Sequence, residues 1–186
     1  MRGEHVELSD SDLIARVLLD DDHHAFGELV KRHQSPVRTT LRKLTGGNEV
    51  LADELAHETF LNAYRSLAKF RGEAKFSTWL YRIAYNVFQG DVRATKAHEL
   101  FDEATHAQAQ EPEIETVDLR HDVDEAMRRL NPKERAAITL CSTSGLTQEE
   151  AAHVLQWPLG TVKTNILTAK EKLRRYLLPW QDRKLT

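Results

Sequence analysis

The sequence predicts an all-α protein built from two small helical domains. Apolar residues recur every three or four positions along most of the chain, and no stretch alternates convincingly between apolar and polar residues as a half-buried strand would. Cap residues, glycines and prolines delimit segments of helical length. From residue 93 to residue 120, apolar residues are sparse and seven acidic side chains stand against three basic ones. We therefore expect domains at residues 1–92 and 121–186, joined by an acidic linker at 93–120.

The N-terminal domain should begin with two capped helices. Ser9, with Asp12 three residues later, predicts an N-cap before the first apolar turn. A second apolar pattern starts at Phe26, and Pro36 is expected to interrupt or restart that helix because proline lacks a backbone N–H. Glycines at 46 and 47 then predict a stop.

Residues 49–67 predict a longer helix with two different faces. The apolar face consists of Ala52, Leu55, Ala56, Thr59, Phe60, Ala63 and Leu67. The opposite face carries Asp53, Glu54, His57, Glu58, Leu61, Asn62 and Arg65. A single exposed leucine is common in soluble proteins, but an apolar anchor within a ring of charges also suits docking on another protein.

The run from Phe70 to Asn86 alternates aromatic rings with cations and ends on an amide. Wound as a helix from Lys75, it puts its apolar side chains on one flank, namely Phe76, Leu80, Ile83 and Val87. A second stripe beside that flank carries Lys75, Trp79, Arg82 and Asn86. Rings can stack on unstacked bases, cations can follow phosphates, and an amide can bond the edge of a flipped base. The alternative is an ordinary amphipathic helix with Trp79 half in the core.

The second domain has three predicted helices after a first amphipathic turn at residues 123–130. Asn131 predicts an N-cap, with Pro132 at the first helical position and Glu134 at the third. Thr147 and Glu150 predict a second capping box, and residues 156–160 break that helix. The last helix starts at about residue 161, with an inward face of Val162, Ile166, Ala169, Leu173 and Leu177.

Two short helices joined by a tight turn, the second longer and basic, predict a helix-turn-helix that reads a major groove. Near the start of its last helix, the side chains predicted to approach base edges are Thr161, Lys163, Thr164, Leu167 and Thr168. Further along, the cations predicted to contact phosphates are Lys170, Lys172, Arg174 and Arg175. The alternative is that these charges only solubilise a small helical bundle.

Composition limits the other function classes. The net charge is only -3, so nucleic-acid binding must come from local patches. The single cysteine, Cys141, excludes an internal disulfide and a cysteine-based zinc cage, and no histidine at an interpretable spacing activates it. His57-Glu58 begins like a zinc-protease motif, but Leu61 replaces the second histidine, and His23-His24 lack a clear third ligand. We expect no catalytic residue, no metal and no cofactor, and therefore no enzyme.

The sequence also argues against a membrane protein. No apolar run reaches the roughly 18 residues of a membrane span, and the acidic N-terminus lacks a signal-peptide core. A cytoplasmic protein without direct membrane insertion is expected.

Several of these segments together resemble a known family. Phe70-Arg71-Gly72, the run 78–84 (Thr-Trp-Leu-Tyr-Arg-Ile-Ala) and Asn86 resemble region 2 of the extracytoplasmic-function (group IV) sigma factors of bacterial RNA polymerase. Residues 56–67 resemble region 2.2 of the same family. Residues 130–163, with their two cap motifs, resemble region 4. The resemblances cover most of the chain in the order that the family has.

The resemblance implies a function for each domain. The first would dock on the clamp helices of the largest polymerase subunit, through the polar face around Leu61, and would recognise and melt the minus-ten element. The second would read the minus-thirty-five element and meet the flap of the second-largest subunit. An anti-sigma factor is the further implied partner. The implied single-strand contacts are Phe70, Arg71, Lys75, Trp79, Arg82 and Asn86, of which Phe70 and Asn86 would form a pocket for a flipped base.

Departures from the family pattern affect individual contacts. Gln156-Trp157 stands where a glycine often occurs, His57 stands where glutamine is frequent, and Asn165-Ile166-Leu167 replaces an arginine-bearing stretch, so that Leu167 could meet a thymine methyl or a protein partner. Asn86 and Phe70 are expected to lie clear of the docking face. The alternative function is a stand-alone helix-turn-helix regulator with an N-terminal sensing or dimerisation domain, but a duplex-only regulator has no use for a stacking platform.

Overall fold

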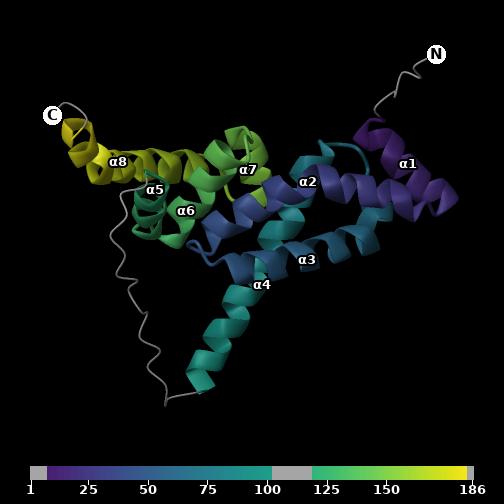
Figure 1. Cartoon of the computed structure of the whole chain (residues 1–186), viewed down its shortest axis with the longest axis horizontal. Coiled ribbons are helices and arrows are strands. Elements are labelled where there is room, and N and C mark those ends of the chain that lie inside the picture. Colours follow the sequence, from purple (N-terminus) through teal and green to yellow (C-terminus); the bar gives the residue numbers. More distant parts are fainter. Residues whose placement is uncertain (1–7, 102–118, 184–186) are drawn as a thin grey trace.

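The described residues of this computed structural model are 8–101 and 119–183, and they form helices with no strand among them (Figure 1). Residues 102–118 of the predicted linker lie outside the described residues. The N-terminal elements are α1 (Asp10–Asp20), α2 (His23–Leu44), α3 (Glu49–Ser66), the 3₁₀ turn η1 (Leu67–Lys69) and α4 (Phe76–Phe101). The C-terminal elements are α5 (Leu119–Arg128), α6 (Pro132–Ile138), the π-helical turn η2 (Thr139–Thr143), α7 (Gln148–Leu155) and α8 (Leu159–Arg183). The all-α prediction is confirmed.

The predicted caps are present and explain where several helices begin. Ser9 caps α1 and exchanges hydrogen bonds with Asp12. Asn131 caps α6 in the same way with Glu134, and Thr147 caps α7 with Glu150. Each box satisfies backbone N–H groups that the first turn of a helix leaves without a partner. The sequence therefore fixes three helix starts by local chemistry alone.

Two predictions about helix ends are wrong. Helix α2 runs through Pro36 without a break, and the Thr40 hydroxyl donates to the Pro36 carbonyl at 2.9 Å. Helix α4 continues to Phe101 instead of ending before the predicted linker. The helix continues because residues 93–97 are mostly strong helix formers, namely alanine, lysine and arginine. These residues are exposed, so intrinsic helix propensity and not packing extends the helix here. The C-terminal part of α4 accordingly projects away from the body of the molecule (Figure 1).

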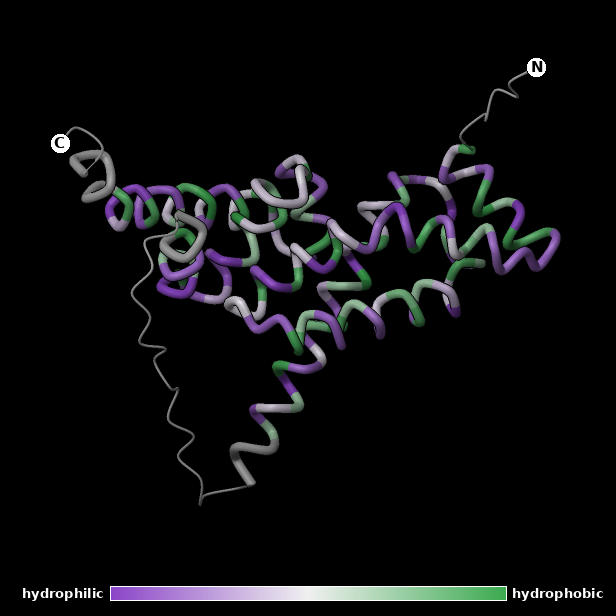
Figure 2. Tube along the Cα trace, viewed as in Figure 1, coloured by the Kyte–Doolittle hydropathy of each residue, from purple (hydrophilic) through white to green (hydrophobic). Residues whose placement is uncertain are grey.

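Hydrophobic and hydrophilic segments alternate along the helices (Figure 2), as expected for helices that bury one side and expose another. In the N-terminal part α2 packs on α1, α3 and α4, and α3 packs on α4. In the C-terminal part α8 packs on α5, α6 and α7. The two parts also pack on each other, α4 against α7 and α2 against both α6 and η2. One continuous hydrophobic core therefore extends through both.

Candidate functional site

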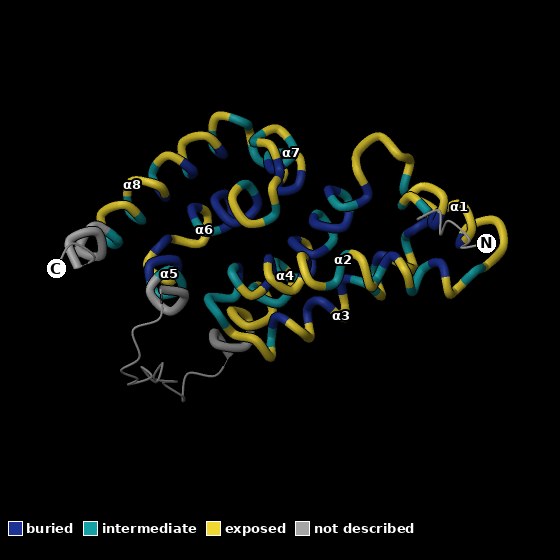
Figure 3. The backbone as a smooth tube through the Cα atoms, turned by 45° about the horizontal axis from the view of Figure 1, so that its top comes forward, coloured by how far each residue is buried: buried dark blue, intermediate teal, exposed yellow. Residues whose placement is uncertain are grey.

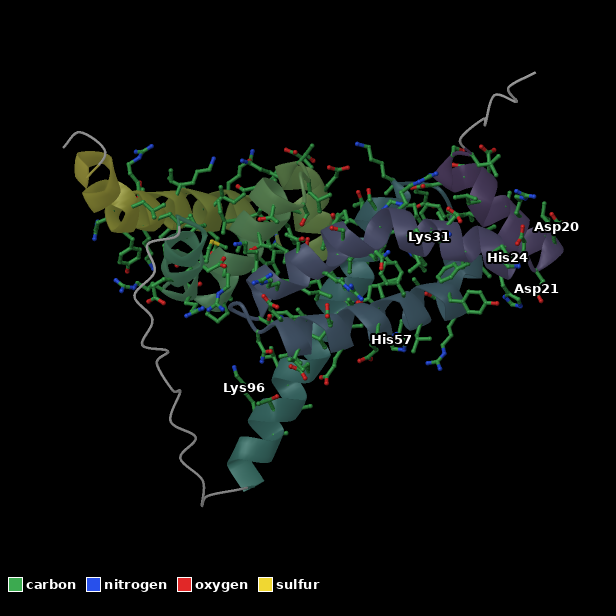
Figure 4. All side chains as sticks on the ribbon, in the orientation of Figure 1. Asp20, Asp21, His24, Lys31, His57 and Lys96 are labelled. Atoms are coloured by element: carbon green, nitrogen blue, oxygen red, sulfur yellow. The ribbon has the colours of Figure 1, made fainter. Side chains whose placement is uncertain are left out.

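The outer side of α3 presents the polar stripe that the sequence predicts. Leu61 is 42% exposed, and Asp53, Glu54, Glu58 and Arg65 are exposed around it. His57 projects from the same outer side (Figure 4), and Asn62 is half-buried at the edge. The Arg38 guanidinium lies 3.3 Å from the Asp53 carboxylate, so α2 steadies one end of this stripe. The apolar face of α3 is buried against α2 and α4, which leaves the stripe free for another molecule.

An aromatic cluster lies where the loop after η1 meets the start of α4. The Phe70 ring centroid lies 5.7 Å from that of Phe76 and 5.4 Å from that of Trp79. Phe76 is buried, whereas Phe70 and Trp79 are half-exposed. The His33 ring joins the cluster from α2, at 5.3 Å from Phe76. Two partly exposed rings on a buried support can offer a face for stacking.

Asn86 lies apart from this cluster, in a cavity of about 690 Å³ between α3 and α4. The cavity is also lined by Glu58, Asn62 and Arg65 from the α3 stripe, whereas Phe70 is not among its lining residues. The expectation that Asn86 lies clear of the docking face is therefore wrong. Asn86 follows Trp79 by seven residues, which is about two turns of α4 or roughly 10 Å. This separation places the Asn86 amide in the cavity between α3 and α4 and not in the aromatic cluster.

Two residues of this region were missed by sequence reasoning. Lys69 lines the Asn86 cavity and is exposed, so it adds a cation beside the amide. Lys69 directly precedes Phe70-Arg71 in the sequence, and this position could have indicated that it belongs to the same site. The second is His153 of α7, whose Nε2 lies 3.2 Å from the Arg82 guanidinium. Nothing in the sequence indicates that α7 and α4 meet.

The outer face of α8 is open (Figure 3). Lys163 and Thr164 are exposed, Leu167 is 60% exposed, and Thr161 and Thr168 are half-buried beside them. The Thr164 hydroxyl donates to the Gly160 carbonyl at 2.9 Å and keeps its lone pairs for an incoming donor. Further along, the exposed cations are Lys170, Arg174 and Arg175. The predicted inward residues Val162, Ile166 and Ala169 are buried, which fixes the orientation of this face.

Lys172 does not belong to the outer face of α8. Its ammonium donates to both oxygens of the Glu134 carboxylate, at 2.8 and 2.9 Å. Glu134 is buried, and it also caps the start of α6. The prediction of a phosphate contact for Lys172 is therefore wrong, because a buried carboxylate requires a cation and Lys172 is the residue that reaches it.

Neither the histidines nor the cysteine form a reactive site in the part of the chain that is described. His24 lies near Asp20 and Asp21 at the corner of α1 and α2 (Figure 4), but no group of three side chains in the described ranges could hold a metal ion. Cys141 is half-buried, and burial raises the pKa of its thiol. A raised pKa disfavours the nucleophilic thiolate. Of the helices described, none is both long and apolar enough to cross a membrane.

Comparisons with known proteins agree with this arrangement. Residues 29–102 match the family model for sigma-70 region 2, and residues 120–173 match the model for sigma-70 region 4. The ECF RNA polymerase sigma-E factor of Haemophilus influenzae is 33% identical over 188 residues, covering 93% of this chain and 97% of the relative. The sigma-E factor of Escherichia coli K12 is 34% identical over 187 residues, covering 93% and 96%.

Solved structures give the same fold. CnrH, in complex with the cytosolic domain of CnrY, is similar with a TM-score of 0.66 and 26% identity, covering 90% of this chain and 96% of that one. The sigma factor RpoE of Bartonella quintana, in complex with the anti-sigma factor NepR, has a TM-score of 0.69 at 23% identity, covering 82% and 96%. The chain belongs to the extracytoplasmic-function sigma factors, the subunits that bind core RNA polymerase and direct it to promoters to initiate transcription.

Proposed function

We propose that the three surfaces divide the work of initiation among them. The α3 stripe docks on the clamp helices of the largest polymerase subunit, the aromatic cluster with Arg71, Lys75, Arg82 and Asn86 holds the opened minus-ten strand, and the outer face of α8 reads the minus-thirty-five duplex. The observation that carries this proposal is that polar stripes remain open on α3 and α8 although both helices are packed on their other sides. The proposed domain boundaries are 1–92 and 121–186, with α4 extending from the first domain into the start of the linker.

We also propose where the protein acts and with which partners. It works in the cytoplasm and has no catalytic chemistry of its own, so the polymerase supplies all bond formation. The similar structure of RpoE from Bartonella quintana contains an anti-sigma factor, and an anti-sigma factor is the proposed inhibitor of this chain as well. The flap of the second-largest polymerase subunit is the proposed contact of the second domain. In vitro transcription with purified core polymerase tests the whole assignment.

Docking is tested by Leu61→Arg and by charge reversal at Glu54 and Glu58. An anchor at the centre of an interface is typically worth 2 kcal/mol or more, so core binding should weaken by about thirtyfold or more. Leu19→Arg is the matched control, because Leu19 is 82% exposed on α1, away from the α3 stripe. Core affinity can be measured by fluorescence anisotropy. Wild-type affinity in all stripe variants would remove the docking assignment.

Melting is tested by Phe70→Ala and Asn86→Ala on matched templates and on templates premelted by mismatches. Loss of the Phe70 ring should slow opening, because base stacking on a ring is worth about 1–3 kcal/mol. Loss of the Asn86 amide should relax selectivity at one minus-ten position. A premelted template should rescue opening, which permanganate reactivity of unpaired thymines reports. Normal opening by Phe70→Ala on paired DNA would show that the ring serves packing alone.

Upstream reading is tested by separating base contacts from phosphate contacts on α8. Lys163→Ala or Thr168→Ala should change the preferred minus-thirty-five sequence in a selection on randomised DNA. Arg174→Ala and Arg175→Ala should weaken binding uniformly and reduce its salt dependence by about one ion per side chain. The same selected motif for every variant would contradict the assignment of α8 as the reader.

A further inference from the structure

We infer that α1 belongs to the proposed minus-ten site: Asp10 of α1 holds the His33 imidazole, and His33 in turn positions the rings that would stack on the opened strand. The inference rests on the proposed function of the aromatic cluster. It makes Asp10 and His33 positioning residues, because both act through Phe76 and not by touching DNA.

His33 stands in a row of α2 that otherwise faces the core. Leu29 and Val37, four residues before and after it, are each 1% exposed. The side chain of His33 is itself only 14% exposed, so its ring nitrogens need partners within the protein. Its Nε2 lies 2.9 Å from Oδ2 of Asp10 in the first turn of α1. A polar ring among apolar neighbours is thus held by a carboxylate from another helix.

The Asp10 carboxylate is itself fixed in place. Its other oxygen, Oδ1, accepts a hydrogen bond from Nη1 of Arg32, and Nη2 of Arg32 donates to the Leu8 carbonyl. Arg32 and His33 are consecutive residues of α2, and together they engage both oxygens of one carboxylate. A carboxylate bound at both oxygens has little freedom to rotate. Asp10 can therefore set the orientation of the His33 ring.

The His33 ring lies against the buried member of the aromatic cluster. Its centroid lies 5.3 Å from that of Phe76, with the two planes at 68°. Phe76 is 4% exposed and contacts both half-exposed rings, Phe70 at 5.7 Å and Trp79 at 5.6 Å. Edge contacts of this kind favour particular angles between rings. A shift of the His33 ring would therefore pass through Phe76 to the two rings proposed to stack.

Helix α1 also contacts the backbone that leads to Phe70. Its buried side chains lie in the same core as Leu67 of η1, and α1 packs on η1 directly. The Phe70 backbone N–H donates to the Leu67 carbonyl at 2.9 Å, where η1 ends. Helix α1 thus supports Phe70 in two ways, through the turn before it and through the ring of Phe76.

Asp12 provides a matched comparison for Asp10, because both carboxylates lie in the first turn of α1. Asp12 accepts from the backbone N–H and the hydroxyl of Ser9 and completes the capping box. Loss of either carboxylate should destabilise the start of α1. Only the loss of Asp10 should also release the His33 ring, so the two variants separate positioning from helix stability.

The experiment uses the holoenzyme and promoter templates that carry 2-aminopurine, placed in turn at each minus-ten position. The fluorescence of this base falls when it stacks on a ring. Asp10→Ala and His33→Ala should slow the opening of paired DNA about three- to tenfold, because part of the stacking free energy is lost. On templates premelted by mismatches, both should also reduce the quenching. Asp12→Ala should keep the opening rate within about twofold of wild type and leave the quenching unchanged.

Two ring variants separate the possible failures. Phe70→Ala and Trp79→Ala should remove the quenching at the stacked position if the cluster holds the strand. If both keep it, the proposed function falls and the inference falls with it. If the ring variants lose the quenching while Asp10→Ala behaves as Asp12→Ala does, the inference alone is wrong.

A milder variant and a double-mutant cycle test the route from Asp10 to the rings. Asp10→Asn keeps an acceptor oxygen toward His33 and should restore opening to within about twofold of wild type. A loss equal to that of Asp10→Ala would contradict positioning through this hydrogen bond. In a Phe70→Ala background, Asp10→Ala should slow opening by less than about twofold more, because a ring that it positions is already gone. Full multiplication of the two effects would show that Asp10 acts elsewhere and would overturn the inference.

Discussion

Helices α4 and α8 both carry a polar stripe with basic residues beside a buried flank, but they stand in different surroundings. Helix α8 packs on α5, α6 and α7 of its own domain and leaves its outer face open. Helix α4 buries Phe76, Leu80 and Val87 of its predicted flank and leaves Ile83 half-buried. It also buries Tyr81 and Tyr85, because α2 and the second domain close over it. The proposed duplex-reading surface is thus accessible, whereas the proposed strand-binding surface is partly covered. Periodicity in a sequence shows which side of a helix is apolar, but not how many neighbours that helix has.

The largest effect that distinguishes the two helices is on stability. Leu80 on α4 is 1% exposed, whereas Leu167 on α8 is 60% exposed. Leu80→Ala should lower the free energy of unfolding by about 2–5 kcal/mol, because it leaves a cavity in the shared core. Leu167→Ala should change it by no more than about 0.5 kcal/mol. Urea titration followed by circular dichroism measures both, and similar values would contradict the different burial of the two side chains.

A smaller effect on stability is expected from the ion pair between Lys172 of α8 and Glu134 of α6. Lys172→Met removes the partner of the buried Glu134 carboxylate and should cost about 1–3 kcal/mol, because hydrogen bonds to a buried charge are lost. Lys170→Met is the matched control, since Lys170 is exposed on the same helix. The same urea titration applies. If the two variants were equally stable, the Lys172–Glu134 pair would contribute nothing to holding α8.

Much of the fold follows from local signals in the sequence. The caps at Ser9, Asn131 and Thr147 act within one turn, so the residues that form them are visible as short motifs. The inward face of α8 follows from its apolar spacing alone. Helix α2 was not predictable in the same way, because packing on three neighbouring helices outweighs the local cost of Pro36.

The site was less predictable than the fold, because it depends on contacts between distant segments. The polar stripe around Leu61 could be predicted, since it lies on one helix. The groove that brings Asn86 to Arg65 needs the packing of α3 on α4. The meeting of Arg82 with His153 joins residues 71 positions apart. No periodic pattern encodes such pairs, and a single sequence offers no other signal for them.

A cap substitution can sharpen the comparison further. Thr147→Ala removes the N-cap of α7 and should cost about 1 kcal/mol of stability, as should Ser9→Ala at the start of α1. Only Thr147→Ala should also speed hydrogen exchange at the backbone amides of α4 around Arg82, because its helix carries Glu150 and His153 against α4. Equal exchange in the two variants would indicate that the start of α7 does not contribute to the packing of the two parts.

The smallest expected effect on stability is absent at neutral pH. It arises from Tyr81 and Tyr85, which are buried residues of α4 outside its predicted apolar flank. Burial raises the pKa of Tyr81 and of Tyr85, and the hydrogen bonds of Tyr81 with Thr40 and Ser144 offset this shift only in part. A raised pKa means that the folded chain retains phenol protons that the unfolded chain would release. The free energy of unfolding should therefore be unaffected by these groups below about pH 10 and should fall as the pH rises above it. Urea titrations between pH 8 and pH 11 should show this fall only at the alkaline end, and Tyr85→Phe should reduce the fall because one titrating group is gone. An unchanged profile in Tyr85→Phe would assign the alkaline transition to other groups, whereas a fall that begins near pH 7 would exclude these two tyrosines as its cause.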